Sequence, residues 1–182
     1  MKILVVGRRN PQKNIIGFLR ALKKVKYSQL SLSIKWIGDI DLAHKSYNET
    51  CLQLVEKWGL ADIIHFYSAT PHILSEYQQC DAFCLPSLFE GFPNVICEAM
   101  SCGKPIICSN ICDNPYIVKD ESNGYLFDPL SDEDIYLALK RFCQKDFKCR
   151  QKMGENSRNI AINLFSQNRF LKKYVQLIEG TV

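Results

Sequence analysis

Two glutamates eight residues apart enclose the stretch of the sequence whose residue types are best suited to binding or catalysis. Glu90 and Glu98 flank Gly91 and Asn94 in the segment SLFEGFPNVICEAMSCGKP. Glycine lets backbone approach a ligand closely, and a helix that opens near Asn94 directs its free N–H groups at any anion beyond its end. Carboxylates beside such a helix end accept hydrogen bonds from the hydroxyls of a ribose or a hexose. Taken singly, Glu98 equally suits an acid that complements the helix dipole, and Glu90 a solvated loop residue. Together with the residues between them, they favour a ligand site.

A second stretch that could bind a ligand is VGRRNPQKN, which begins at the last residue of the apolar run 2–6 and turns at Gly7. It offers a guanidinium at Arg8 and an ammonium at Lys13, both suited to phosphate. Their spacing can bring both cations over the same strand ends. On its own, surface charge explains this stretch equally well.

The elements that must position these residues alternate regularly along the chain. Short apolar runs predict six strands, at 2–6, 32–37, 62–66, 82–86, 105–109 and 125–127. Apolar spacing of the helical kind and glycine stops predict helices at 14–25, 44–58, 71–79 and 94–102, and from about 132, 149 and 167. Asn123-Gly124 is interpreted as a turn, and Ser131 with Asp134 as a capping box.

This order predicts a single α/β domain over residues 1–182, Rossmann-like, with a parallel sheet of about six strands and helices on both faces. Ligands of such sheets bind beyond the carboxyl ends of the strands. The loops after residues 6, 38, 67, 86 and 109 are therefore the places to search.

Composition excludes several other classes of protein. Of the 182 residues, 47% are hydrophobic and 23% charged, which argues against disorder, collagen and coiled coil. No apolar run is long enough for a membrane span, and the N-terminal run is too short for a signal peptide, so we expect a cytoplasmic protein. The nine cysteines include no C-x-x-C pair, which favours reduced and mostly buried thiols.

The net charge of +4 is mild and does not indicate nucleic acid. Its distribution is more informative, because no acidic residue precedes Asp39 and a second basic run extends over residues 140–173. A phosphate-bearing ligand, an acidic partner or an anionic membrane surface would each explain such patches. For the cluster at residues 20–26 we favour solvated helix faces.

With these residues in place, the chain resembles the donor-binding C-terminal half of the retaining glycosyltransferases of the GT-B fold, the "group 1" family. The resemblance covers nearly the whole chain. It is carried by the VGR…K opening, by Pro86-Ser87 followed by Glu90-Gly91-Phe92-Pro93-Asn94 and Glu98, by Gly103-Lys104-Pro105-Ile106-Ile107, and by Asn123-Gly124-Tyr125.

The resemblance implies transfer of a sugar from a nucleotide diphosphate sugar, with retention of the anomeric configuration. The nucleotide it implies is UDP, because UDP is common among donors of the family. In that reaction Arg8 and Lys13 neutralise the diphosphate, Glu98 binds the ribose and Glu90 holds hydroxyls of the transferred sugar. The catalytic groups would be Glu90, Arg8 and Lys13. The donor-binding residues would be Gly7, Tyr67, Ser68, Thr70, Phe92, Pro93, Asn94, Val95 and Glu98.

The chain departs from the family pattern at three places: Ser68 stands where glycine is usual, Gly38 is followed by Asp39-Ile40-Asp41, and Asp113-Asn114-Pro115-Tyr116 replaces a glycine-rich turn. Because the chain has the length of only one of the two GT-B domains, we expect an excised domain, in preference to a naturally split protein, that binds donor and transfers little without the acceptor-binding N-terminal domain. The other partners we expect are that domain and a membrane surface or lipid-linked acceptor.

Several alternatives are weighed against this interpretation. Asp39-Ile40-Asp41 matches the metal-binding D-x-D of other glycosyltransferases, but Arg8 and Lys13 already supply positive charge, so no metal or other cofactor is expected. His44, His65 and His72 lack metal-ligand spacing. A sugar-nucleotide epimerase fits the EGFPN segment poorly. A non-catalytic module that binds a nucleotide sugar or a partner subunit stays open, although paired carboxylates favour enzyme ancestry.

Overall fold

The sheet has six parallel strands, as predicted, in the order β3-β2-β1-β4-β5-β6. The computed structural model describes residues 1–28 and 30–180. The strands are β1 (Lys2–Val6), β2 (Ser33–Ile37), β3 (Ile64–Tyr67), β4 (Ala82–Leu85), β5 (Ile106–Ser109) and β6 (Gly124–Phe127). Because the order reverses between β1 and β4, the loops after these two strands border the crevice where such sheets bind ligands.

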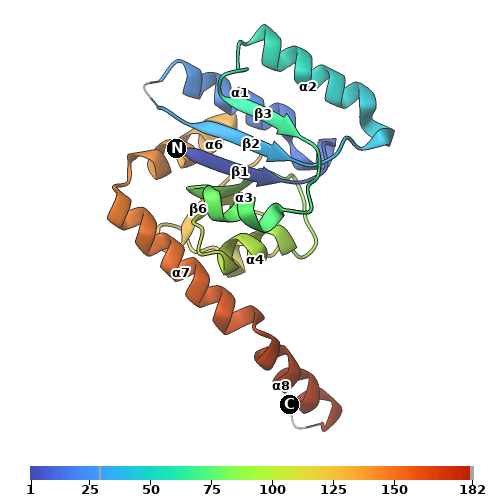
Figure 1. The fold of residues 1–182 in the computed structure, drawn as a ribbon, viewed down its shortest axis with the longest axis vertical. Coiled ribbons are helices and arrows are strands. Elements are labelled where there is room, and N and C mark those ends of the chain that lie inside the picture. The colour runs from blue at the N-terminus through green and yellow to red at the C-terminus, as the bar shows by residue number, and fades with distance from the viewer. Residues whose placement is uncertain (29, 181–182) are drawn as a thin grey trace.

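Helices cover both faces of this sheet, which confirms the predicted three-layer α/β architecture (Figure 1). One layer contains α1 (Ile15–Lys26), α2 (Lys45–Lys57) and α6 (Asp132–Gln144). The other contains α3 (Ile73–Gln79), α4 (Asn94–Ser101), the short α5 (Asn114–Ile117) and the long α7 (Phe147–Phe165). Two single-turn helices, η1 (Pro11–Lys13) and η2 (Leu42–His44), follow β1 and β2.

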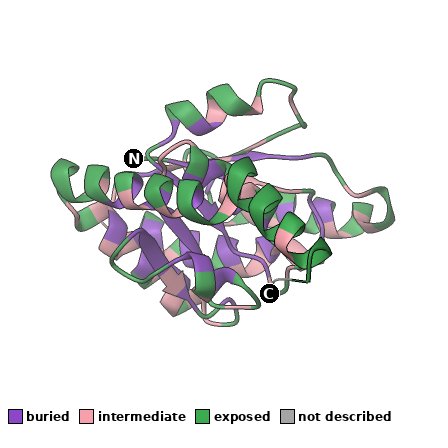
Figure 2. Ribbon diagram, turned by 90° about the horizontal axis from the view of Figure 1, so that it is seen from below, coloured by how far each residue is buried: buried purple, intermediate pink, exposed green. Residues whose placement is uncertain are grey.

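The core forms because the central strands are apolar on both sides. Ile3, Leu4 and Val5 of β1 are at most 1% exposed, and alternate residues enter the two clusters above and below the sheet. Figure 2 shows buried residues concentrated on the strands and on the inner faces of the helices. Burial on both faces explains why the strands appear in the sequence as continuous apolar runs.

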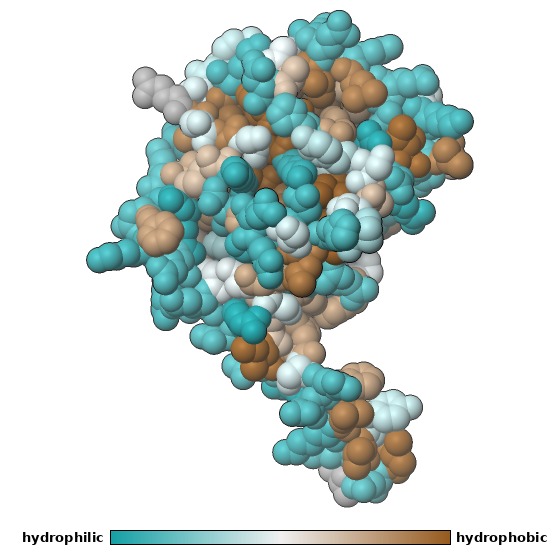
Figure 3. Space-filling model, in the orientation of Figure 1, coloured by the Kyte–Doolittle hydropathy of each residue, from teal (hydrophilic) through white to brown (hydrophobic). Residues whose placement is uncertain are grey.

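The last helix, α8 (Gln167–Ile178), extends away from the sheet (Figure 1). Apolar side chains gather on it at the surface, as Figure 3 shows. Phe170 is 64% exposed, and its ring stacks on that of Tyr174 at 5.8 Å between centroids. No helix in the described part of the chain combines the length and apolar character that crossing a bilayer requires.

Two local predictions need correction. Ser131 caps α6, since its Oγ accepts from Asp134 N at 3.1 Å, but the reciprocal bond of a capping box is not made, because the Asp134 carboxylate accepts from Asp128 N at 2.6 Å. The predicted Asn123-Gly124 turn is correct only for Asn123, which closes a turn, because Gly124 is the first residue of β6 and pairs with Ile106. Asn123 before it is fully buried, and its side chain bonds the loop backbone.

The basic residues of α1 are largely engaged in packing. Lys24 pairs with Asp132 and Glu133 of α6, while Lys23 lies 5.4 Å from the centroid of the Trp58 ring. Lys26 donates to the Trp58 carbonyl oxygen at 2.9 Å. These lysines lie at the surface but contact α6 and Trp58, so they are not the purely solvated charges that the sequence predicted.

All nine cysteines are free thiols, as the sequence predicted, but only four of them are buried. Burial raises the pKa of Cys84 and Cys108, which lie inside β4 and β5, whereas Cys112 and Cys149 are exposed. We expect iodoacetamide to label Cys112 and Cys149 readily in native buffer and to leave Cys84 and Cys108 unlabelled. Peptide mass spectrometry checks this, with a sample in urea as the control in which every cysteine reacts. Equal labelling of Cys84 in both samples would contradict the burial of this thiol inside β4.

Candidate functional site

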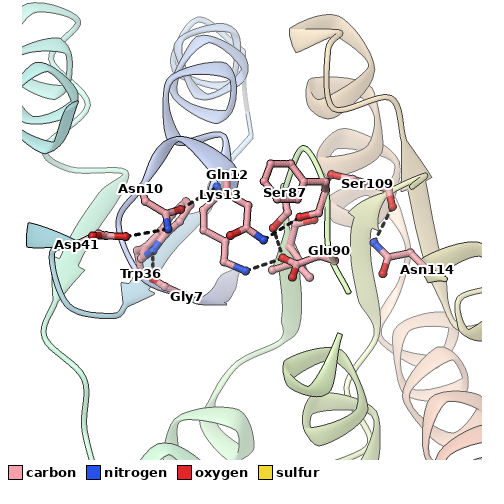
Figure 4. Close-up of polar contacts among 12 residues, drawn as sticks. Gly7, Asn10, Gln12, Lys13, Trp36, Asp41, Ser87, Glu90, Ser109 and Asn114 are labelled. Atoms are coloured by element: carbon pink, nitrogen blue, oxygen red, sulfur yellow. Dashed lines mark hydrogen bonds and ion pairs between the residues drawn. The ribbon is translucent and has the colours of Figure 1, made fainter. Parts of the chain in front are cut away.

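The loops after β1 and β4 meet at the carboxyl end of the sheet through a salt bridge. Lys13 Nζ lies 2.5 Å from Glu90 Oε1, with 14% and 11% of the two side chains exposed. The buried Ser87 donates from Oγ to the same carboxylate oxygen at 2.5 Å. Figure 4 shows Lys13 and Ser87 reaching Glu90 from the two loops. The structure thus brings together two predicted catalytic residues that are far apart in sequence.

Gln12 fastens these two loops to each other. Its side-chain Nε2 donates to the Phe89 carbonyl oxygen at 3.0 Å, and its backbone carbonyl oxygen accepts from Leu88 N at 2.8 Å. Sequence reasoning missed both Gln12 and Ser87 as parts of the site. Ser87 was noticed only as a family feature, and no local pattern marks Gln12, because its partners lie on the loop after β4.

The turn that carries Lys13 is built by the residues around it. Asn10 caps η1, since its Oδ1 accepts from Lys13 N at 3.3 Å, and Pro11 begins that helix. The side chain of Lys13 then passes over Gly7, where an added Cβ would lie 2.9 Å from Lys13 Cε. Gly7 therefore makes room for the lysine that reaches Glu90.

The two arginines of this turn have different surroundings. Arg8 is exposed at the strand end, and no side-chain partner is described for it. Arg9 is 9% exposed and lies 5.6 Å from the centroid of the Phe66 ring, and burial lowers its pKa against the opposing effect of Asp39. Arg8 is thus placed to meet a ligand, whereas Arg9 packs into the fold.

The start of α4 is open to an anion. Pro93 precedes the helix without an N–H of its own, and within the described chain no side chain caps this end. An added Cβ at Gly91 would have no atom within 4 Å, so the loop is open at this position. The exposed ring of Phe92 turns toward α7, where it meets Phe165 at 5.8 Å between centroids. The N–H of Asn94 donates to the Phe92 carbonyl oxygen at 3.0 Å, which leaves the N–H of Val95 for an anion at the start of the helix.

Glu98 lies one turn further along α4 and is exposed. Glu98 lies past the first turn of the helix, where the effect of the helix dipole has fallen off. Stabilisation of the dipole therefore does not explain a glutamate at this position. Its Oε2 accepts a hydrogen bond from the Tyr77 hydroxyl of α3 at 2.8 Å. Tyr77 is a further site residue that the sequence did not reveal.

The loop after β3 shows a mixed outcome. Ser68 and Thr70 are near the carboxyl end of β3, and Thr70 Oγ1 accepts from His72 N at 3.2 Å. The ring of Tyr67 instead lines a cavity on the sheet face, 5.0 Å from Lys35 Nζ. The side chain of Tyr67 therefore does not lie beside Glu90 and Glu98.

Asp39 and Asp41 hold loops together. Asp39 Oδ1 accepts from Ala69 N at 2.9 Å, and Asp41 accepts from Ala43 N at 3.2 Å and from Asn10 Nδ2 at 3.3 Å. The Asn10 bond is the main cause of the lowered pKa of Asp41. These bonds join the loops after β1, β2 and β3. Among the described residues, no three His, Cys, Asp or Glu side chains are grouped as a metal site requires.

Comparison with known proteins decides the family. Residues 1–160 match the model of the glycosyl transferases group 1. The chain belongs to this family. A galactosyltransferase of Escherichia coli, named as UDP-Gal:alpha-D-GlcNAc-diphosphoundecaprenol alpha-1,3-galactosyltransferase, is 36% identical over 167 residues, which are 89% of this chain and 41% of the relative.

Solved structures agree with the fold of this group 1 chain. HepE from Anabaena in complex with UDP superposes with a TM-score of 0.89 at 21% identity, over 98% of this chain and 48% of HepE. The C-terminal domain of LpcC, a group 1 protein of Francisella tularensis, superposes with a TM-score of 0.80 at 24% identity, over 91% of this chain and 86% of that domain. The chain thus spans less than half the length of the E. coli relative and of HepE.

Proposed function

We propose that this chain binds the donor of a retaining glycosyltransferase reaction, a nucleotide diphosphate sugar with UDP as the nucleotide. The observation that carries the proposal is the Lys13–Glu90 pair beside the uncapped start of α4. The choice of UDP is supported by the names of the E. coli relative and of the HepE complex.

In the proposed complex, the diphosphate lies at the start of α4 and meets the charges of Arg8 and Lys13. The backbone at residues 92–95 approaches the phosphates, Glu98 accepts from the ribose hydroxyls, and Glu90 accepts from hydroxyls of the sugar to be transferred. Because Asp39 and Asp41 are engaged with loop backbone and Asn10, we assign the neutralisation of phosphate to the two cations and not to a metal ion.

The proposed reaction breaks the bond between the anomeric carbon and the diphosphate oxygen. A hydroxyl oxygen of the acceptor bonds to that carbon and gives its proton to the leaving diphosphate, and the sugar keeps its anomeric configuration. Arg8 and Lys13 stabilise the charge that develops on the leaving diphosphate. The acceptor is a lipid-linked or other glycan, as the name of the E. coli relative suggests, and its site belongs to an N-terminal domain that pairs with this one. By itself, the chain binds donor and transfers little.

Isothermal titration of the chain with UDP, GDP and ADP, and then with UDP-sugars, tests the proposal. We expect UDP to bind best, and Glu98→Ala to weaken UDP by roughly 1–3 kcal/mol, the cost of removing hydrogen bonds to a charged group. Glu56→Ala is the matched control, since Glu56 is exposed on α2, which belongs to the opposite helix layer.

Unchanged UDP affinity in Glu98→Ala would overturn the ribose assignment. Absence of binding by all three nucleotides at millimolar concentration would contradict donor binding by this chain. Selective binding of UDP without transfer, even when an N-terminal domain from a relative is supplied, would favour the non-catalytic module over the enzyme.

A further inference from the structure

Tyr77 presents a buried hydroxyl to the candidate site from α3. The side chain is 1% exposed, and its ring packs at 5.7 Å between centroids on Phe83 in the middle of β4. A hydroxyl buried to this extent needs a hydrogen-bond partner, and Tyr77 finds it in Glu98 Oε2 at 2.8 Å. Burial, followed by the neighbouring Glu98 carboxylate, raises the pKa of Tyr77 well above its usual value, so the group stays protonated and donates.

The hydrogen bond from Tyr77 restricts the rotamers of the Glu98 side chain. It is exposed and borders a groove of about 500 Å³ between α3 and α4, whose other lining residues include Leu74, Asn94 and Ser101. A long side chain beside such open space samples several rotamers, and fixing it on ligand binding costs entropy. The ring of Tyr77 is locked by packing, so its hydroxyl is a fixed point for one carboxylate oxygen.

We infer that Tyr77 is a positioning residue that holds Glu98 Oε2 and thereby turns Oε1 toward the ribose hydroxyls of the nucleotide. The inference rests on the proposed function, because it takes Glu98 as the ribose acceptor. Tyr77 touches no ligand in this arrangement. It acts by preorganising the carboxylate, so that less entropy is lost when the ribose binds.

Tyr77→Phe tests the inference, because it removes the hydroxyl and keeps the ring that packs on Phe83. Titrations use two probes, UDP and the 2′,3′-dideoxy analogue of UDP, which lacks the ribose hydroxyls. We expect the variant to bind UDP about 3 to 10 times more weakly and the dideoxy analogue as well as the unmodified chain does. Tyr125→Phe is the matched control: Tyr125 is also fully buried, but it belongs to the opposite cluster, with Arg141 4.4 Å from its ring centroid.

The outcomes separate positioning from general packing and from the proposed function. Equal weakening of both probes by Tyr77→Phe would show a packing effect and overturn the inference, as would unchanged binding of UDP. Glu98→Ala is run in parallel and should abolish the preference for UDP over the dideoxy analogue. If Glu98→Ala keeps that preference, the ribose assignment itself fails. If it loses the preference while Tyr77→Phe keeps it, only the positioning role is wrong.

Discussion

Replacing Lys13 by alanine is expected to destabilise the fold and the donor site together. The Lys13–Glu90 pair is 14% and 11% exposed at its two side chains, and removal of the ammonium leaves Glu90 with Ser87 as its remaining described partner. Breaking a largely buried ion pair from one side leaves a poorly solvated charge, at a cost of about 3 kcal/mol in the free energy of unfolding. Chemical denaturation monitored by circular dichroism measures this loss.

Two variants keep this expectation falsifiable. Lys13→Met combined with Glu90→Gln removes both charges, and we expect it to recover most of the lost stability, because no unpaired charge is left. Lys24→Ala breaks an exposed pair with Asp132 and Glu133 and should leave the unfolding midpoint almost unchanged. If Lys13→Ala and Lys24→Ala had the same small effect, the Lys13–Glu90 pair would not be a structural contact of this site.

The same Lys13→Ala variant carries an expectation about the ligand. Lys13 is assigned to the diphosphate, so UDP should lose more affinity than uridine, which carries no phosphate. Arg8→Ala should show the same preference with little effect on stability, since Arg8 is exposed and Lys13 is nearly buried. Equal losses for UDP and uridine would remove both residues from the phosphate site.

The fold was predictable because its signals are local. Runs such as residues 2–6 and 82–86 are apolar throughout, and this pattern identifies strands buried on both faces without knowledge of their neighbours. The boundaries shifted by at most two residues, and α5 was not predicted, because its four residues, Pro115 among them, give too short a pattern to recognise. Ser131 shows a further limit, since its cap was predictable but the partner of Asp134 depended on the path of the preceding loop.

The candidate site was predictable only where chemistry stands out in the sequence. Charged groups such as Lys13 and Glu90 were identified by type, and the parallel sheet placed them at one edge. Tyr77 was not identified, because a tyrosine on an apolar helix face has the appearance of ordinary core. Its role depends on a hydroxyl whose partner lies 21 residues away on another helix. Such a contact depends on how two helices pack together, and the residue spacing within one helix does not predict it.

Gly124 offers the clearest test of that packing, because the sequence placed it in a turn and the structure places it at the start of β6. An added Cβ at Gly124 would lie 1.7 Å from the Ile106 carbonyl oxygen, within the ladder that joins β5 and β6. Ile106 and Gly124 are paired residues of β5 and β6, so their backbones cannot make room for the Cβ without separating the strands. We expect Gly124→Ala to lower the free energy of unfolding by about 3 kcal/mol, at the upper end for overpacking, as measured by chemical denaturation.

Gly91→Ala is the matched control, and it should show the opposite pattern. Open space surrounds the position where its Cβ would be, so the free energy of unfolding should change by no more than about 0.5 kcal/mol. Gly91 belongs to the loop that leads into α4, where we propose that the phosphates bind, so a side chain there should crowd the ligand and the affinity for UDP should fall. A stable Gly124→Ala protein would refute the strand assignment at residue 124. A Gly91→Ala protein with unchanged UDP affinity would show that the ligand does not approach this loop.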